Sequence, residues 1–327
     1  LLAGRAYVDA ETLDRNDPGR RSALRTDLPG DAYLIDISQS LAAGTIRLLV
    51  APDPYGQQRG IRATASIAAT SDLAIVAQGG VQIAAATAGR DLAVIDLSMA
   101  SSSLGNLQAG GTLQVVVDQL TIPDGARWVA RDDIHLGNIG NNSDRTTQFA
   151  NHGTVEAGRD LVLAFGGTGI PRNRGILRAG RDVLGAGPDG EVLFDLLPFV
   201  LTDVLSLPRH GGIPGDSMVW GSGFLDNSGA QGTRPGRIEA GRDAHLIYGP
   251  NSFGGTLVAG NDLHLWRFPS PADPPVAGPD DIWRTRSLDQ AGPDFAADPG
   301  FAHAVRDLWL HHLPVNCAVR LCGFGGP

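Results

Sequence analysis

The residues of this chain that most resemble catalytic machinery are arginine–aspartate pairs, because carboxylates serve as acids, bases and nucleophiles in polysaccharide cleavage. Four examples are Arg90-Asp91, Arg159-Asp160, Arg181-Asp182 and Arg242-Asp243. All four hold the same position in a recurring phrase, whereas a catalytic centre needs one irregular cluster of converging groups. The only adjacent acids, Asp132-Asp133 and Asp280-Asp281, have no neighbours that mark a cleft. We therefore expect the pairs to act in turns and the chain not to be an enzyme.

Histidines are the second group that could do chemistry, as metal ligands. His135, His245 and His264 hold equivalent positions in three copies of the phrase, so stacked copies would align some of them in a solvated ladder on one outward side. His311 and His312 are adjacent and would point apart on a helix, with no Cys, Asp or Glu at ligand spacing. Phosphate-loop, dinucleotide and nucleophile-elbow motifs are absent from the sequence. We expect neither a metal site nor a cofactor.

The recurring phrase is a sequence motif of ten positions. It begins with a small residue, an apolar residue and any residue, continues with Ala-Gly, then Arg or Asn, then Asp, and ends with an apolar residue, any residue and a second apolar residue. Good copies occupy residues 88–94, 154–163, 175–184, 237–246 and 256–265, and looser copies occupy residues 71–75, 109–115 and 130–136. The residue before the apolar triplet falls at positions 72, 91, 112, 133, 160, 182, 243 and 262, so most steps lie near 20. The step of 27 contains a polar insertion near residues 141–145, and the step of 61 needs a larger insertion or two degenerate units.

A unit of this size cannot bury its apolar face alone, so neighbouring units must stack. Runs such as Leu161-x-Leu163 are too short for helices and alternate with the period of strands. The Gly between the two runs of a unit is expected to take a positive φ at a corner, and the Asp after it to bond nearby amides in an Asx turn. Stacked strands of this kind pair in parallel about 4.8 Å apart. The sequence thus predicts an all-β fold, a parallel β-helix with coils of about 20 residues.

The repeated Ala-Gly-Arg-Asp-Leu phrase resembles the haemagglutinin repeats of filamentous haemagglutinin and, more widely, the large exoproteins of bacterial two-partner secretion. The resemblance covers residues 66–266. It implies a right-handed β-helical shaft without catalytic residues, export through an outer-membrane partner pore, and a secreted or cell-surface location. The shaft would belong to a filamentous adhesin whose loops contact a ligand on a host or neighbouring cell, a glycan among the candidates. Two alternatives stay open: the stalk of a contact-dependent inhibition exoprotein, and a polysaccharide-active or polysaccharide-binding β-helix.

Cys317 and Cys322 are the only cysteines, and an exported chain would meet an oxidising compartment. A disulfide between them is therefore expected, with two free thiols as the alternative. Their spacing fits neither a redox Cys-x-x-Cys motif nor a zinc knuckle. Some two-partner adhesins end in a cysteine-closed loop that holds the protein in its secretion pore, and by analogy this pair could form a C-terminal anchor.

Residues 186–231 differ most from the repeat and are expected to form a small, partly helical insertion. They contain apolar runs and a Gly-rich stretch, and they either pack on the shaft, contact a partner, or form two degenerate coils. The residues expected to make a partner contact are Phe194, Leu197, Phe199, Leu201, Trp220 and Phe224.

The ends of the chain also depart from the repeat. Residues 1–32 are charged and irregular, and coils are expected over residues 33–185 and again over residues 232–267. Residues 268–327 begin with a Pro-rich connector. Asp298-Pro299 then has the character of a helix start, and Phe301, Val305, Leu308 and Trp309 follow at helical spacing. This pattern predicts a short amphipathic helix before the cysteine-containing tail.

Composition narrows the set of partners. The chain has no Lys, a net charge of −9 and a pI near 5.3, which disfavours nucleic acid and anionic lipid surfaces. No apolar stretch reaches the roughly 18–20 residues that span a bilayer. The sequence opens Leu1-Leu2-Ala3-Gly4 without Met or a signal peptide, and we expect it to be a piece of a longer protein.

Overall fold

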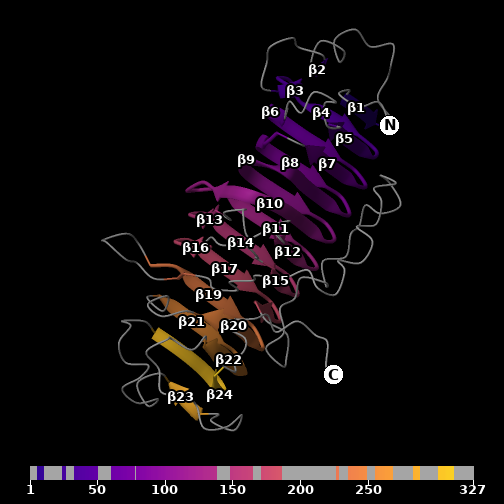
Figure 1. The fold of residues 1–327 in the computed structure, drawn as a ribbon. Helices are drawn as coiled ribbons and strands as arrows, with labels where there is room; N and C mark the ends of the chain where they lie inside the picture. The colour runs from indigo at the N-terminus through magenta and orange to yellow at the C-terminus, as the bar shows by residue number, and fades with distance from the viewer. Residues whose placement is uncertain are drawn as a thin grey trace, which may run out of the picture.

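A computed structural model shows the repeated units as strands that stack in parallel along one axis (Figure 1). The structure describes residues 6–10, 24–26, 33–50, 60–77, 79–137, 148–164, 171–185, 226–227, 235–248, 255–267, 283–287 and 301–312. This part of the chain is all-β and contains no helix, which confirms the predicted fold class at that level. The insertion expected to be partly helical lies outside the described residues, apart from residues 226–227.

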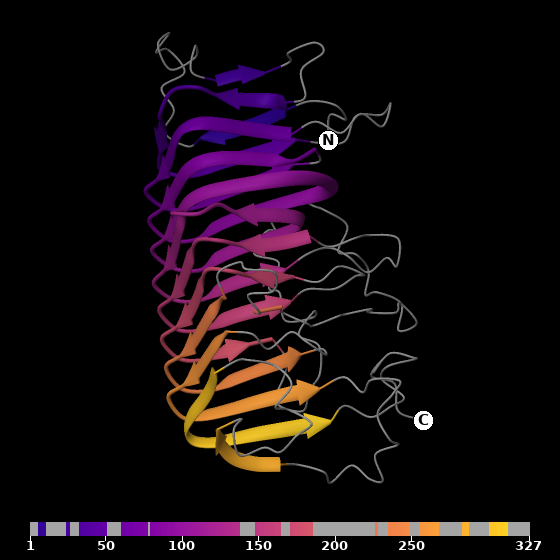
Figure 2. The same cartoon turned by 90° about the vertical axis from the view of Figure 1, so that its left-hand side faces the viewer.

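Each coil contributes up to three strand segments, and segments one coil apart pair in register to build three faces (Figure 2). Face I contains β4 (Leu41–Ala43), the ends of β6 (Gly60–Ala69), β8 (Val81–Ala88) and β9 (Leu92–Ala109), then β11 (Arg127–Ala130), β14 (Thr154–Ala157), β17 (Ile176–Ala179), β19 (Arg237–Ala240), β21 (Thr256–Ala259) and the start of β24 (Phe301–His312).

Faces II and III are built in the same way. Face II contains β5 (Ile46–Val50), β7 (Leu73–Ala77), the starts of β9 and β10 (Leu113–Ile122), then β12 (Ile134–Gly137), β15 (Leu161–Ala164), β18 (Val183–Leu184), β20 (Ala244–Tyr248), β22 (Asp262–Arg267) and the end of β24. Face III contains β3 (Tyr33–Ile37), the starts of β6 and β8, the middle of β9, the end of β10, β13 (Gln148–Asn151) and β16 (Arg172–Asn173).

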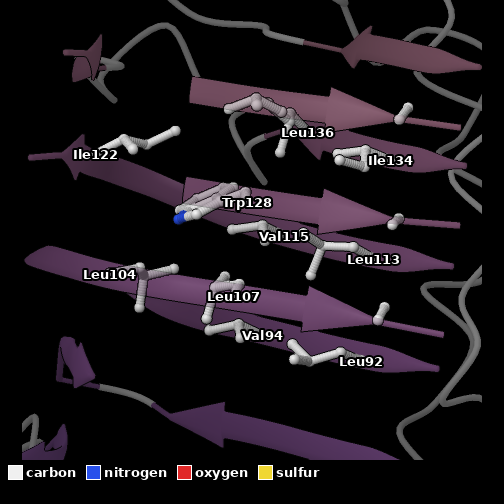
Figure 3. Packing of buried hydrophobic residues seen from close by; sticks show 14 of the residues in the cluster. Leu92, Val94, Leu104, Leu107, Leu113, Val115, Ile122, Trp128, Ile134 and Leu136 are labelled. Carbon is white, nitrogen blue, oxygen red and sulfur yellow. The ribbon is translucent and has the colours of Figure 1, made fainter. Parts of the chain in front are cut away.

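The core fills the space that the three faces enclose. One inward position of face II forms a column through this core, and its residues in successive coils are each at most 1% exposed. They are Leu92, Leu113, Ile134, Leu161 and Val183. In Figure 3 the labelled side chains of successive coils lie one above another, with the Trp128 ring among them. The Trp128 indole N–H donates to the Gly105 carbonyl at 2.7 Å, which satisfies the one polar group of the largest buried side chain. Small and aliphatic residues therefore fill the narrow interior, as the repeat predicts.

The glycines of the Ala-Gly corners differ from the prediction. Only Gly80 and Gly125 have positive φ among the described residues, and neither belongs to an Ala-Gly-Arg-Asp corner. The corner glycines are needed for close approach: a Cβ on Gly180 would lie 2.2 Å from the Gly158 carbonyl oxygen, and one on Gly241 would lie 2.1 Å from that of Gly180. Coils meet backbone to backbone at these glycines, and a Cβ added to either of them would force a shift.

Two long steps in the repeat are resolved by the pairing. β12 pairs directly with β15, so residues 138–147 are an insertion within one coil. Likewise β17 pairs with β19 and β18 with β20, and between them Asp226, one of two described residues, is bridged to Arg172 of face III. The step of 61 is therefore an insertion into a single coil and not two degenerate units.

The predicted C-terminal helix is wrong, because residues 301–312 form strand β24. Ala302, Ala304 and Leu308 are buried, whereas Val305 and Arg306 are exposed at the corner. The segment is a further copy of the repeat. Arg306-Asp307-Leu308 is its Arg-Asp-Leu, and Val305 stands at the position of the corner glycine. Val305 is 63% exposed, since the corner points away from the core. Pairing with β21 and β22 outweighs the local helical spacing.

Antiparallel strands terminate the stack at both ends. β1 (Ala6–Ala10) pairs with β5, and β2 (Leu24–Thr26) pairs with β3, within the stretch that the sequence suggests is irregular. β23 (Trp283–Ser287) pairs with β24 at the other end. These strands cover edges of the first and last described coils, which would otherwise present unpaired backbone groups.

The close approach of coils at the corner glycines predicts that one added methyl group will destabilise the fold. Gly180→Ala should lower the free energy of unfolding by about 1–3 kcal/mol, because its Cβ would overlap a backbone oxygen that cannot rotate away. Gly185→Ala is the matched control, since its Cβ would first meet the flexible end of Leu246 at 3.3 Å. Chemical denaturation of both variants measures the difference, and equal midpoints would contradict the proposed role of the corner glycine.

Candidate functional site

The arginine–aspartate pairs form a ladder along the corner between faces I and II. The guanidinium of one coil binds the carboxylate of the preceding coil, with Nε–Oδ1 distances of 2.8 Å for Arg159–Asp133 and 2.9 Å for Arg242–Asp182. The other rungs are Arg90–Asp72, Arg181–Asp160 and Arg306–Asp262. At Asp243 the partner is the Asn261 side chain, at 2.9 Å. Each two-pronged contact thus joins consecutive coils.

The same carboxylates also accept backbone N–H groups. The Asp160 N–H donates to Asp133 Oδ1 at 3.1 Å, and the Asp243 N–H donates to Asp182 Oδ1 at 3.1 Å. The predicted local Asx turn is therefore wrong at these positions, because the acceptor serves an amide one coil further along the chain. The vertical distance between coils is short enough for one carboxylate to bind both an arginine and a main-chain amide of the next coil.

Two carboxylates of the ladder, those of Asp133 and Asp262, have a lowered pKa. The hydrogen bond from Arg159 holds the pKa of Asp133 below its ordinary value, and the bond from Arg306 does the same to the pKa of Asp262. The pKa of Arg159 is raised in turn, mainly by its hydrogen bond to Asp133. A general acid needs a carboxyl group that holds a proton near the working pH. These two carboxylates instead join one coil to the next.

A second polar ladder lies inside the stack, and sequence reasoning missed it. The Asn151 side-chain N–H donates to Asn173 Oδ1 at 2.8 Å, and Asn173 in turn donates to Asn227 Oδ1 at 2.7 Å. All three residues are at most 3% exposed and also bind backbone groups. The available signal was the spacing of Asn-x-Gly at residues 151, 173 and 227, since two of these positions are one coil apart and the third follows the insertion.

A buried carboxylate at the corner between faces II and III is the third polar feature. Asp96 is fully buried, and its oxygens accept the Ser98 N–H at 3.0 Å, the Ser98 hydroxyl at 2.7 Å and the Ser102 hydroxyl at 3.1 Å. Burial raises the pKa of Asp96, and the bonds from Ser98 and Ser102 oppose that shift. The Gly79 backbone in the preceding coil also bonds to Asp96, so this buried cluster both shapes the bend in β9 and joins two coils.

Chain insertions concentrate at that same corner. Residues 51–59, 138–147, 186–225 and 268–282 each follow a strand of face II and lie in coils that are longer than the others, before the chain continues around the coil. The corner between faces I and II contains only two or three residues in every described coil up to β22. Residues 228–234 are an insertion between faces III and I. One edge of the stack therefore bears most of the variable chain, and in repeat proteins such an edge is often the binding side.

The predicted histidine ladder is present in part, on the outer surface of face II. The His245 and His264 rings stack with their centroids 4.3 Å apart, and the Trp309 ring follows at 5.9 Å. His135 lies in the same column but apart from them, with Val162 and Leu184 between. Burial and the neighbouring His245 lower the pKa of His264 to about 4. No group of three metal-binding side chains occurs within the described ranges.

The remaining predicted site residues cannot be placed. Both cysteines, Cys317 and Cys322, lie outside the described residues, as do the six expected contact residues. Those six are Phe194, Leu197, Phe199, Leu201, Trp220 and Phe224. His311 and His312 belong to β24.

Compared with known proteins, the chain matches no family model, no curated protein and no solved structure. In the part of the chain that is described, no helix has the length and apolar character needed to cross a bilayer.

Breaking one rung of the arginine–aspartate ladder should weaken the stack locally. Asp182→Ala removes the acceptor of Arg242 and of the Asp243 N–H, and should cost about 1–3 kcal/mol of unfolding free energy. Asp132→Ala is the control, because Asp132 contacts only its neighbour Arg131, at 3.3 Å, among the ion pairs of the described chain. Hydrogen exchange of the amides on either side of the rung should rise in Asp182→Ala alone, and equal exchange in both variants would refute the role of the ladder.

The ring stack predicts a dependence of stability on pH. The pKa of His264 is about 4 in the folded chain against an ordinary 6.5, so the neutral ring stabilises the fold fully above pH 6.5 and that contribution is lost as pH falls towards 4. Asp262 and Asp243 favour protonation, whereas burial, His245 and Arg306 oppose it. His264→Gln should therefore reduce the drop in Tm between pH 7 and pH 4.5. The exposed His152 supplies the control variant, His152→Gln, and an identical drop in all three proteins would exclude the effect.

Proposed function

We propose that the parallel stack is a right-handed β-helix that serves as the shaft of a large filamentous exoprotein, an adhesin similar to filamentous haemagglutinin. Crossover connections between parallel strands are right-handed in almost all proteins, which supports the handedness. The inter-coil ladders support a stiff rod, because each coil binds the next through main-chain bonds, arginine–aspartate pairs and buried asparagines.

The concentration of insertions at the corner between faces II and III is the observation that carries this proposal. A rod whose coils are interrupted mainly at one edge presents variable loops along one side, while the other corners keep the stack continuous. The ligand would be a surface molecule of a host or neighbouring cell, with glycans among the candidates. The ladder carboxylates already bind arginine, and the lowered pKa of Asp133 and of Asp262 supports a structural role over polysaccharide cleavage.

Export completes the proposal. A chain of this kind would pass through an outer-membrane pore of the two-partner type and remain secreted or held at the bacterial surface. A disulfide between Cys317 and Cys322 would then close an anchoring loop near the pore. The stalk of a contact-dependent inhibition exoprotein shares the same rod and pore, and differs in the domain that the rod carries.

The proposal is tested on the full protein in the bacterium that produces it. Surface biotinylation of intact cells should label the protein, and deletion of the partner pore gene should abolish that labelling. Replacing residues 138–147 with a short Gly-Ser linker should reduce attachment to target cells at least fivefold, while the matched replacement of residues 123–126 at another corner leaves attachment unchanged. Labelling that persists without the pore refutes the export route, and equal attachment of both variants refutes the contact edge.

A further inference from the structure

A turn at residues 123–126 joins face III to face I between β10 and β11. It contains four residues, whereas the equivalent corner of the next coil, His152-Gly153, contains two. The Ala126 N–H donates to the Pro123 carbonyl at 3.1 Å, and Gly125 has a φ of +76°, as the third residue of a type II turn requires. The two middle residues of the turn are exposed, so this corner presents main chain to solvent.

The side chain of Asp124 lies against the main-chain nitrogen that follows it. The Gly125 N–H donates to Asp124 Oδ1 at 3.1 Å, and this is its only hydrogen bond in the part of the chain that the structure describes. A Cβ added to Gly125 would meet nothing within 4 Å, so neither the glycine nor its surroundings obstruct the Asp124 carboxyl group. A carboxyl carbon and an amide nitrogen held this close, in an open place, are arranged to react with each other.

We propose that Asp124-Gly125 is a site of spontaneous covalent modification, at which aspartate converts to isoaspartate through a cyclic succinimide. The Gly125 nitrogen bonds to Cγ of the protonated Asp124 carboxyl group, and the amide proton leaves with the carboxyl hydroxyl group as water. Water then opens the ring: attack at the former side-chain carbonyl restores aspartate, and attack at the main-chain carbonyl leaves the chain joined through Cγ. The reaction needs no reactant besides water and does not depend on the proposed adhesive role.

The modification has a structural consequence, because isoaspartate lengthens the main chain in a turn that touches the next coil. The Ala126 carbonyl accepts the Thr154 N–H of that coil at 2.9 Å. A Cβ on Gly153 would lie 2.4 Å from the Ala126 oxygen and 3.0 Å from the Pro123 oxygen, so the turn lies directly against the coil below it. The longer turn must therefore move outward and weaken the bond to Thr154, and the two coils separate locally as the protein ages.

Ageing of the folded full chain tests the proposal. After prolonged incubation at neutral pH, peptide mapping with isoaspartyl methyltransferase as the probe should find at least tenfold more isoaspartate at Asp124 than at Asp132. Asp132 is the internal control, because it is partly exposed but is followed by Asp133 and not by glycine. Peptide mapping also separates the signal from that of Asp189-Gly190, the second Asp-Gly pair of the sequence. If Asp124 isomerises only after unfolding in urea, or not at all, the proposal is overturned.

Asp124→Glu supplies the matched variant. It keeps the carboxylate and the exposed turn, but its additional methylene would require a larger ring, which closes far more slowly. The aged variant should lose the methyltransferase signal at position 124 by at least tenfold. Hydrogen exchange of the Thr154 amide should rise at least fivefold on ageing of the unaltered chain and stay constant in the variant. An equal signal in both proteins would overturn the assignment, and equal exchange at Thr154 would overturn its structural consequence.

Discussion

The rise from one coil to the next is the constraint on which the rest of the structure depends. Parallel main-chain hydrogen bonds set this rise at about 4.8 Å, and every side chain along the stack must accept it. Glycine occupies most corners between faces I and II, and there a Cβ would overlap a carbonyl oxygen of the preceding coil. The same rise brings the arginine of one coil within reach of the aspartate of the preceding coil, and the asparagines inside within reach of one another. One repeated distance thus accounts for the Ala-Gly-Arg-Asp phrase.

The three faces use their outer surfaces differently, and this asymmetry gives the rod its sidedness. On face I, Arg178 lies between Glu156 and Glu239 and binds both, which produces a charged, hydrated surface. On face II the equivalent outward positions from Ala93 to His264 are apolar or aromatic, apart from Gln114. Insertions emerge mainly where face II ends. The apolar surface and the variable chain therefore adjoin along a single edge, while face I remains suited to contact with water.

Much of the fold could be predicted from the sequence, because every coil needs the same residue types at the same spacing and the sequence therefore repeats. The period, the strand character and the structural role of the Arg-Asp pairs follow from alternation and fixed spacing. Features that depend on contacts between coils could not be read from one unit: the corner glycines proved to serve close approach and not positive φ, and the aspartates proved to bind the next coil and not their own turn. The last copy, around Arg306, was hidden because Val305 replaces glycine and because its apolar residues also fit a helical period. Of the candidate contact edge between faces II and III, the sequence could predict only that insertions interrupt the repeat, because the edge itself is formed by the stacking of coils.

The arginine–aspartate ladder has a direction. In every rung the carboxylate belongs to the earlier coil and the guanidinium to the later one, and the amide that shares the carboxylate also comes from the later coil. A finished coil therefore offers preset acceptors, and the coil that follows supplies all the donors. If the chain emerges from a channel with its N-terminus first, the arginine and amide donors of each emerging coil can bind the carboxylates of the coil that has already folded outside. Coils still inside the channel have no folded neighbour to bind. Folding would then proceed in one direction, from the first repeat to the last. The binding energy of each rung would be gained outside the channel, where it opposes movement of the chain back into the channel.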